Sequence, residues 1–302
     1  MKNYITLFLK GMAMGASDVV PGVSGGTIAF ISGIYERLIN AIKSINVTNL
    51  KLLFTGKFGQ FWRNVDCNFL LCIVLGIAFS FLTLAKIITH LLETQPIFIW
   101  AFFFGLVIAS TLFVGRDVKW NIKTIATFAA MAILSFFITS PQNQPMMQND
   151  ALWYIFLCGA IAICAMILPG ISGSFILVLL GQYQFMLQAI STLNIVVLVT
   201  FMCGAIIGIV SFANILSWLF AHFKQITLAA LVGFMFGSLN KIWPWKNTLQ
   251  TYTDSHGTIK PLIQENILPT IDANFATALC LTIAGFAIIF TIEFVSKKMH
   301  KK

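Results

Sequence analysis

Charged side chains are scarce in this chain of 302 residues. Asp, Glu, Lys and Arg make up 10% of it, whereas a water-soluble domain carries about 25%. An ordinary soluble fold is therefore excluded. Acidic residues are the scarcer kind, and the formal net charge is +9. The basic residues lie between apolar runs, where positive charge sets membrane topology, so we predict no nucleic-acid partner.

Cysteine and histidine are too few and too scattered to build a metal centre. The six cysteines form no C-x-x-C pair, and none has a histidine at metal-ligand spacing. Most of them lie in apolar segments, where cysteine usually acts as a small buried hydrophobe. The sequence predicts neither a metal site nor a cofactor.

Apolar sequence, by contrast, is abundant. Hydrophobic residues make up 58% of the chain, and the mean hydropathy is +0.89. About 20 consecutive apolar residues cross a bilayer. The clearest stretches near or above this length are Phe69–Leu92, Pro96–Val114, Ile195–Ala221 and Phe275–Val295. The chain is therefore predicted to cross a membrane several times.

The sequence also repeats itself. At one constant offset, Pro21-Gly22 matches Pro169-Gly170 and Ser24-Gly25 matches Ser172-Gly173. Downstream the matches continue at an offset 20 residues shorter, where for example Gly105 falls on Gly233. The lost residues belong to the basic loop Lys43–Asn68, which has only a short counterpart in the second copy. This pattern indicates an internal duplication.

Each copy holds a hairpin broken at Pro-Gly, followed by three apolar spans. We predict an all-α membrane protein made of two inverted repeats, each a re-entrant helical hairpin plus three transmembrane helices. The arms of the hairpins are short for full crossings, and a hairpin adds an even number of crossings to three spans, so the second copy must be inverted. The predicted first repeat is 1–145, with hairpin 5–42 and spans at about 69–92, 96–114 and 122–139. The predicted second repeat is 151–296, with hairpin 152–190 and spans at about 195–221, 226–240 and 273–295.

Lysine and arginine predict the orientation. With both termini cytoplasmic, fifteen basic residues fall inside and three outside, and Lys86 lies within a span. Such a bias is typical of cytoplasmic loops. We therefore expect an inner-membrane protein whose N- and C-termini are cytoplasmic and whose long external loop is Lys241–Asp272.

The broken hairpins are the predicted binding site. A Pro-Gly break frees backbone groups that lipid cannot satisfy, so it must be buried in protein or line a polar cavity. Matching breaks in inverted halves are typical of a transporter's site. After each break a serine stands where a new half-helix begins, and a helix start favours phosphate or carboxylate. Alternatively, the glycines serve tight helix packing and the serines satisfy local backbone.

Few charged residues lie near membrane depth, and such residues are usually functional. Asp18 precedes the first break, at the helix end that disfavours its charge, and its counterpart is Met166. It is the best candidate to couple transport to a proton or cation; alternatively it caps backbone or pairs with Lys10 or Arg37. For Glu36 and Arg37 the alternatives are that they bind substrate, that they pair with each other, or that their side chains extend to the membrane interface. For Lys86 the alternatives are contact with an anionic headgroup or extension of its side chain to the interface. The predicted substrate-binding residues are Asp18, Pro21, Gly22, Ser24, Gly25, Gly26, Thr27, Glu36, Arg37, Lys86, Pro169, Gly170, Ser172, Gly173 and Ser174.

Three segments resemble a bacterial family of polyprenyl-phosphate transporters that was formerly a domain of unknown function. They are DVVPGVSGGTIAFISGIYERL (Asp18–Leu38), ILPGISGSFILVLLGQY (Ile167–Tyr183) and KIWPWK (Lys241–Lys246). The resemblance covers nearly the whole chain. It implies a membrane lipid transporter, not an enzyme, that returns undecaprenyl phosphate from the outer to the cytoplasmic leaflet for cell-envelope synthesis.

Two other functions use related chemistry. An undecaprenyl-diphosphate phosphatase also has inverted re-entrant hairpins, but its P-G-x-S-R-S motif has an arginine where this chain has Gly25 and Gly173. The clustered glutamates of that enzyme are also missing, because Glu36, Glu93, Glu265 and Glu293 lie far apart in the sequence. An anion channel could use the same half-helix starts. A channel needs a continuous pore and a lipid carrier a lateral opening, and the residues alone do not separate the two.

Overall fold

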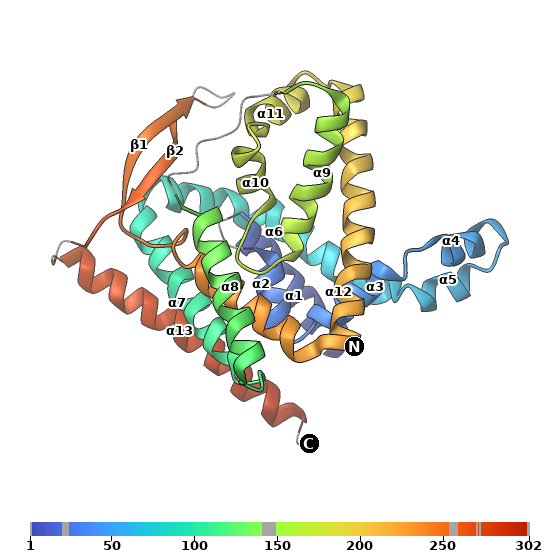
Figure 1. Cartoon of the computed structure of the whole chain (residues 1–302), viewed down its shortest axis with the longest axis horizontal. Coiled ribbons are helices and arrows are strands. Elements are labelled where there is room, and N and C mark those ends of the chain that lie inside the picture. Colours follow the sequence, from blue (N-terminus) through green and yellow to red (C-terminus); the bar gives the residue numbers. More distant parts are fainter. Residues whose placement is uncertain are drawn as a thin grey trace. The chain divides into compact units, whose positions relative to one another are not determined.

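The computed structural model describes residues 2–19, 24–140, 149–253, 259–269, 271 and 273–300 (Figure 1). It is mostly helical and forms two compact units. The first unit comprises Met1–Thr89, Asp150–Ile176 and Val199–Thr227, and the second comprises His90–Asn149, Leu177–Leu198 and Leu228–Lys302. Each unit therefore takes residues from both sequence copies.

The two hairpins share one pattern of helices. The first copy has α1 (Lys2–Asp18), α2 (Gly25–Ile31) and α3 (Tyr35–Lys43). The second has α9 (Leu152–Ile167), α10 (Gly173–Leu179) and α11 (Tyr183–Ser191). Both ends of α2 and of α3 recur in α10 and α11 at the offset of the sequence repeat.

The second arm of each hairpin consists of two helices. It is divided by a turn at Gly33 (φ 71°) in the first copy and at Gly181 (φ 67°) in the second. Such a positive φ suits glycine because it has no Cβ. The chain bends by 111° between α10 and α11, as in a broken span or a re-entrant loop.

Four helices in the described part of the chain are long and apolar enough to cross a membrane. They are α6 (Cys67–Thr94), α7 (Pro96–Gly115), α12 (Ile195–Ser238) and α13 (Ala273–His300). A shorter apolar helix, α8, covers Ile122–Ile138. The chain is thus a multi-pass membrane protein. The predicted spans 195–221 and 226–240 lie on the two sides of a kink in α12 at Phe223, whose backbone angles (φ −133°, ψ 42°) are not helical.

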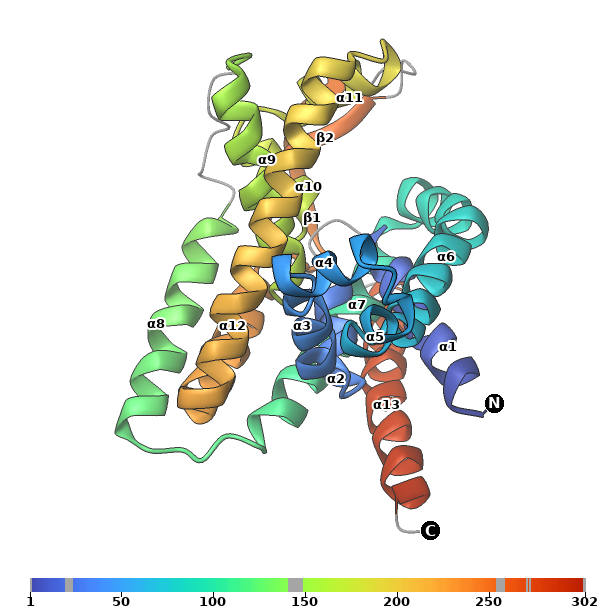
Figure 2. The same cartoon turned by 90° about the vertical axis from the view of Figure 1, so that its right-hand side faces the viewer.

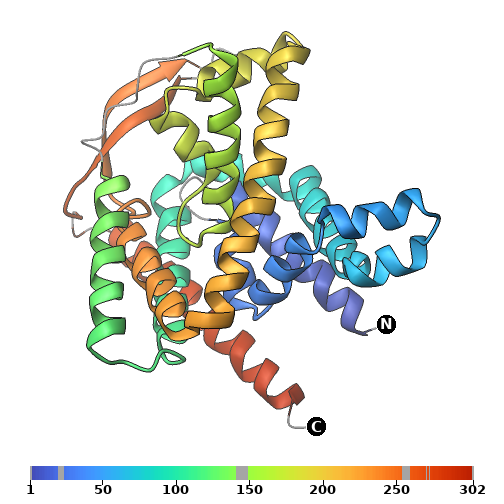
Figure 3. The same ribbon diagram turned by 45° about the vertical axis from the view of Figure 1, so that its right-hand side comes forward.

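Glycines set the packing of the first unit. A Cβ at Gly11 of α1 would overlap the Ile73 carbonyl of α6, and a Cβ at Gly159 of α9 would overlap the Phe201 carbonyl of α12. Figures 1 and 3 show α9 beside this part of α12. Small residues let membrane helices approach to backbone contact. The same close pairing therefore occurs once in each copy.

In the second unit, glycines join the two copies. A Cβ at Gly105 of α7 would overlap the Thr282 carbonyl of α13, and a Cβ at Gly233 of α12 would overlap the Phe128 carbonyl of α8. The second span of each copy therefore packs on the third span of the other copy. Figures 1 and 2 show α7 beside α13.

Two loops contain structure that the sequence did not predict. The predicted external loop holds an antiparallel pair, β1 (Lys246–Thr253) and β2 (Ile259–Asn266), so the fold is not purely helical. The strands are polar, so the sequence has no alternation of apolar and polar residues that would have indicated them. The basic loop Lys43–Asn68 holds α4 (Val47–Phe54) and α5 (Phe58–Asn64).

Candidate functional site

Residues that follow the first hairpin break meet the second break inside the first unit. The Ser24 hydroxyl donates a 2.7 Å hydrogen bond to the Met166 carbonyl, near the end of α9. The Tyr35 hydroxyl donates to the neighbouring Ile167 carbonyl at 3.1 Å. The Gly170 amide, within the second break, donates to the Thr27 hydroxyl at 3.0 Å. Side chains of the first copy thus satisfy backbone groups that the second break has freed.

Glycine makes this contact possible on both sides. A Cβ at Gly26 would overlap the Ile167 carbonyl, so α2 touches the end of α9 through its backbone. Gly170 has a φ of 100°, which a residue with a Cβ rarely adopts. Ser24 and Thr27 are completely buried in the junction. These residues therefore hold the start of α2 against the second break.

The start of α2 already holds an anionic group. The Gly25 amide donates a 2.6 Å hydrogen bond to the Asp18 carboxylate, and the Gly26 amide donates to the Ser24 hydroxyl at 3.0 Å. Asp18 is the last residue of α1, a position that disfavours negative charge, but its carboxylate lies at the favourable end of α2. The sequence argument considered only the end of α1, which disfavours the charge of Asp18, and did not consider the start of α2.

The second copy has hydroxyl groups instead of a carboxylate at the matching place. The Ser172 hydroxyl accepts a 3.3 Å hydrogen bond from the Phe175 amide and lies 3.2 Å from the Ser174 hydroxyl. Ser172 is buried and Ser174 is exposed. A Cβ at Gly173 would lie 2.8 Å from the Ala162 carbonyl oxygen, so Gly173 also serves close packing. The two half-sites are chemically unequal.

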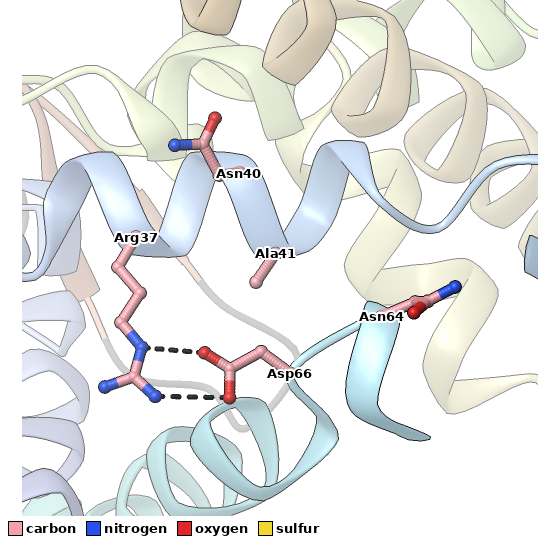
Figure 4. Close-up of a pocket in the computed structure, with 5 residues that line it drawn as sticks. All are labelled: Arg37, Asn40, Ala41, Asn64 and Asp66. Atoms are coloured by element: carbon pink, nitrogen blue, oxygen red, sulfur yellow. Dashed lines mark hydrogen bonds and ion pairs between the residues drawn. The ribbon is translucent and has the colours of Figure 1, made fainter. Parts of the chain in front are cut away.

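Arg37 pairs with a residue that the sequence reasoning missed. Its Nε lies 2.7 Å from one carboxylate oxygen of Asp66, and its terminal nitrogen lies 3.1 Å from the other (Figure 4). Its guanidinium lies 4.3 Å from the centre of the Phe69 ring. Arg37, Asn40, Ala41, Asn64 and Asp66 line an open pocket of about 420 Å³. No spacing in the sequence could have indicated this pair, because a separately folded loop places Asp66 beside α3.

The other polar residues of α3 contact α12. The Glu36 carboxylate forms a 2.7 Å ion pair with Lys224. The Ser217 hydroxyl donates to the Asn40 side chain at 2.8 Å and accepts from the Lys43 ammonium at 3.1 Å. One alternative from the sequence was that Glu36 and Arg37 pair with each other. The structure shows that each pairs with a different residue instead.

The remaining alternatives for Asp18 can be compared with the structure directly. Lys10 donates to the Ser32 carbonyl at 2.6 Å and Arg37 pairs with Asp66, so Asp18 caps backbone rather than pairing with either cation. Pro169 is buried in the second break. Pro21 and Gly22 lie outside the described residues, as does the side chain of Lys86 in α6.

The described residues do not bring three His, Cys, Asp or Glu side chains together in the way a metal ion requires. The start of α2 has an amide that holds a carboxylate, and the start of α10 has an exposed hydroxyl at Ser174.

Comparison with known proteins gives a consistent result. A family model described as undecaprenyl phosphate translocase-like matches residues 14–260. A polyprenyl-phosphate transporter of Vibrio cholerae serotype O1 is 42% identical over 304 residues, which cover 98% of this chain and 98% of that protein. A polyprenyl-phosphate transporter of Staphylococcus aureus is 30% identical over 253 residues, which cover 78% of this chain and 85% of that protein. No solved structure matches the chain.

Proposed function

Because the chain belongs to the undecaprenyl phosphate translocase-like family, we propose that it carries undecaprenyl phosphate from the outer to the cytoplasmic leaflet of the inner membrane. The observation that carries this proposal is the junction of the two breaks, where the start of α2 holds a carboxylate. A phosphate headgroup has the same need for backbone N–H donors. The recycled lipid would serve cell-envelope synthesis.

In this proposal the two sequence copies are inverted repeats, and their hairpins re-enter the membrane from opposite sides. Two observations support it. The ends of α2 and α3 recur in α10 and α11 at the sequence offset, and each copy's second span packs on the other copy's third span. Such a reciprocal exchange is what a two-fold axis between the copies produces. The N- and C-termini are cytoplasmic in this arrangement.

The phosphate binds by replacing Asp18 at the Gly25 amide. The exposed Ser174 hydroxyl and its neighbour Ser172 donate to the phosphate from the second copy. Ser24, Gly26 and Thr27 keep their present contacts and act as the frame of the site. Burial supports this division for Ser24 and Thr27, which have no exposed surface, and for Ser174, which is exposed. Ser172 is buried and joins the site through its contact with the Ser174 hydroxyl.

Asp18 couples the exchange to a proton or cation. A lipid phosphate carries about −1.5 to −2 charges at neutral pH, and moving each charge inward costs about 2.3 kcal/mol per 100 mV. Protonating Asp18, or pairing it with a cation, weakens its hold on the Gly25 amide and leaves that amide to the phosphate. The positive charge gained at Asp18 then offsets part of the charge of the headgroup at this site and reduces the cost of the crossing.

Arg37 and Lys224 receive the headgroup on the cytoplasmic side. Both cations now hold carboxylates, Asp66 and Glu36 respectively. A guanidinium that binds a carboxylate with two nitrogens fits phosphate in the same way. These pairs are about half-exposed, so they contribute little stability and can be exchanged.

The test is transport of a fluorescent polyprenyl phosphate by the purified protein in vesicles, read as loss of label from the outer leaflet. Ser172→Ala with Ser174→Ala should slow the rate about tenfold or more, as the loss of charge-assisted hydrogen bonds would. Ser191→Ala, an exposed serine of α11 that bonds within its own helix, is the matched control.

Two outcomes of that assay contradict the proposal. Release of inorganic phosphate from a polyprenyl diphosphate would identify the phosphatase instead. An ion current without movement of the lipid would identify the channel.

A further inference from the structure

The basic loop Lys43–Asn68 is an ordered element without an equivalent of its length in the second copy. Asn46 caps α4 by accepting a 2.9 Å hydrogen bond from the Asn49 amide. The Asn64 side chain donates to the Asn49 side chain at 2.9 Å and ties α5 to α4. The two helices and the turn between them, Val47–Asn64, are called the α4–α5 hairpin below. Figures 1 and 3 show it projecting from the end of α3.

This hairpin exposes large apolar side chains. Phe54 is 90% exposed, Val47 70% and Phe58 63%. Val47, Leu50 and Phe54 follow at helical spacing along α4, and Phe58 and Trp62 do so along α5. Each helix therefore has an exposed apolar face, and such faces mark a surface that binds a partner or a membrane.

The charge of the hairpin has one sign. Lys51, Lys57 and Arg63 are exposed, and no Asp or Glu lies between Ser44 and Val65. Basic residues beside exposed aromatic and aliphatic residues are typical of helices that lie in a membrane interface and attract acidic lipids. With 8 and 7 residues, α4 and α5 are much too short to cross a bilayer.

We propose that the α4–α5 hairpin lies in the headgroup layer of the cytoplasmic leaflet and binds acidic phospholipids there. The apolar side chains enter the boundary with the acyl chains, and Lys51, Lys57 and Arg63 bind the phosphate groups. The charge of the hairpin favours lipid over a protein partner. The hairpin has three basic side chains and no acidic one, and a leaflet rich in acidic lipid complements that charge. This role is independent of the transport reaction and gives the first copy a fixed depth at the membrane surface.

The test uses the full-length protein without its native cysteines, carrying Phe54→Cys labelled with a polarity-sensitive dye. The protein is placed in nanodiscs of phosphatidylcholine alone or of phosphatidylcholine with phosphatidylglycerol. In the acidic discs the emission should shift to the blue, and brominated lipid should quench it. Each of Lys51→Gln, Lys57→Gln and Arg63→Gln should weaken the response to acidic lipid about fivefold.

The same dye at Gln60→Cys, which lies away from Phe58 and Trp62 along α5, is the control and should stay in water in both discs. A dye at position 54 that reports water in both kinds of disc would overturn the proposal and favour a protein partner. The proposal would also be overturned if the dye at position 54 still responded to acidic lipid after Lys51, Lys57 and Arg63 had all been replaced by Gln. The comparison of lipids needs no charge variant, so a variant that fails to fold does not weaken it.

Discussion

The Gly25 amide and the Asp18 carboxylate are joined by a 2.6 Å hydrogen bond across the first hairpin break. The last residue of one helix therefore occupies the anion position at the start of the next. Because the second copy has Met166 at the position of Asp18, only one of the two breaks carries its own anion.

Replacing Asp18 by Asn tests whether this carboxylate couples transport to a proton or cation. The amide keeps the shape and can still accept from the Gly25 amide, but it does not titrate. We expect Asp18→Asn to transport the lipid with a much weaker dependence on the pH and cation gradients than the parent. The measurement is the flipping rate in vesicles with defined gradients, and Asp117→Asn in a loop between helices is the control. An unchanged dependence would show that Asp18 is structural.

Gly26→Ala should destabilise the protein, because the added Cβ would overlap the Ile167 carbonyl. Overpacking of this kind costs about 1–3 kcal/mol, and here backbone must move. Gly59→Ala is the matched control, since the space around a Cβ at Gly59 is open and alanine favours a helix over glycine by about 0.5–1 kcal/mol. Thermal unfolding in detergent compares the two variants. Equal midpoints would mean that α2 and α9 do not touch as described.

The stability of the protein should rise with pH because of two lysines in the loop after α12. Burial lowers the pKa of Lys241 to about 8. The pKa of Lys246, which donates to the Lys241 carbonyl and lies 4.1 Å from the centre of the Trp100 ring, is lowered by burial and then by the charge of Lys241. From about pH 8 to about pH 10 the unfolded chain binds more protons than the folded chain, so stability rises with pH in that window. Below about pH 8 Lys241 is charged in both states, and its full destabilising effect is present.

Lys241→Met should flatten this dependence and raise the unfolding midpoint at neutral pH by about 2 °C or more. Unfolding curves across the window, with Lys123→Met as the control for loss of an exposed lysine, measure both effects. If the unfolding temperature of the parent protein decreases as the pH is raised from about 8 to about 10, the assignment is contradicted.

The position of the β-strand loop tests the topology. Leu268 is 87% exposed, and Leu268→Cys in a background without native cysteines should react with an impermeant maleimide from outside the cell. Gln60→Cys on the α4–α5 hairpin should react only after the membrane is permeabilised. The reverse pattern would place both termini outside.

The sequence predicted elements that depend on local pattern and missed contacts that depend on the fold. The span 96–114 corresponds to α7 because a proline starts it and an unbroken apolar run follows. The turns at Gly33 and Gly181 were missed although both glycines belong to the repeat, since a single glycine also occurs inside membrane helices. The partners of Glu36 and Arg37 were missed because Lys224 and Asp66 approach α3 only after folding.

The hydroxyl groups of the first break show a different limit. Ser24 and Thr27 were predicted to bind substrate from their place in the motif, and in the structure they are bonded to Met166 and Gly170. Their binding of substrate stays a prediction. A motif records which residues the break requires. It does not distinguish the groups that hold the break together from those that remain open to a ligand.

The packing of α7 on α13 has a consequence for biosynthesis. Gly105 lies against the Thr282 backbone, and the ribosome makes α13 long after α7. Until α13 has been made, the glycine face of α7 lacks the helix that it packs on. A chain that stops before α13 therefore leaves this face of α7 uncovered.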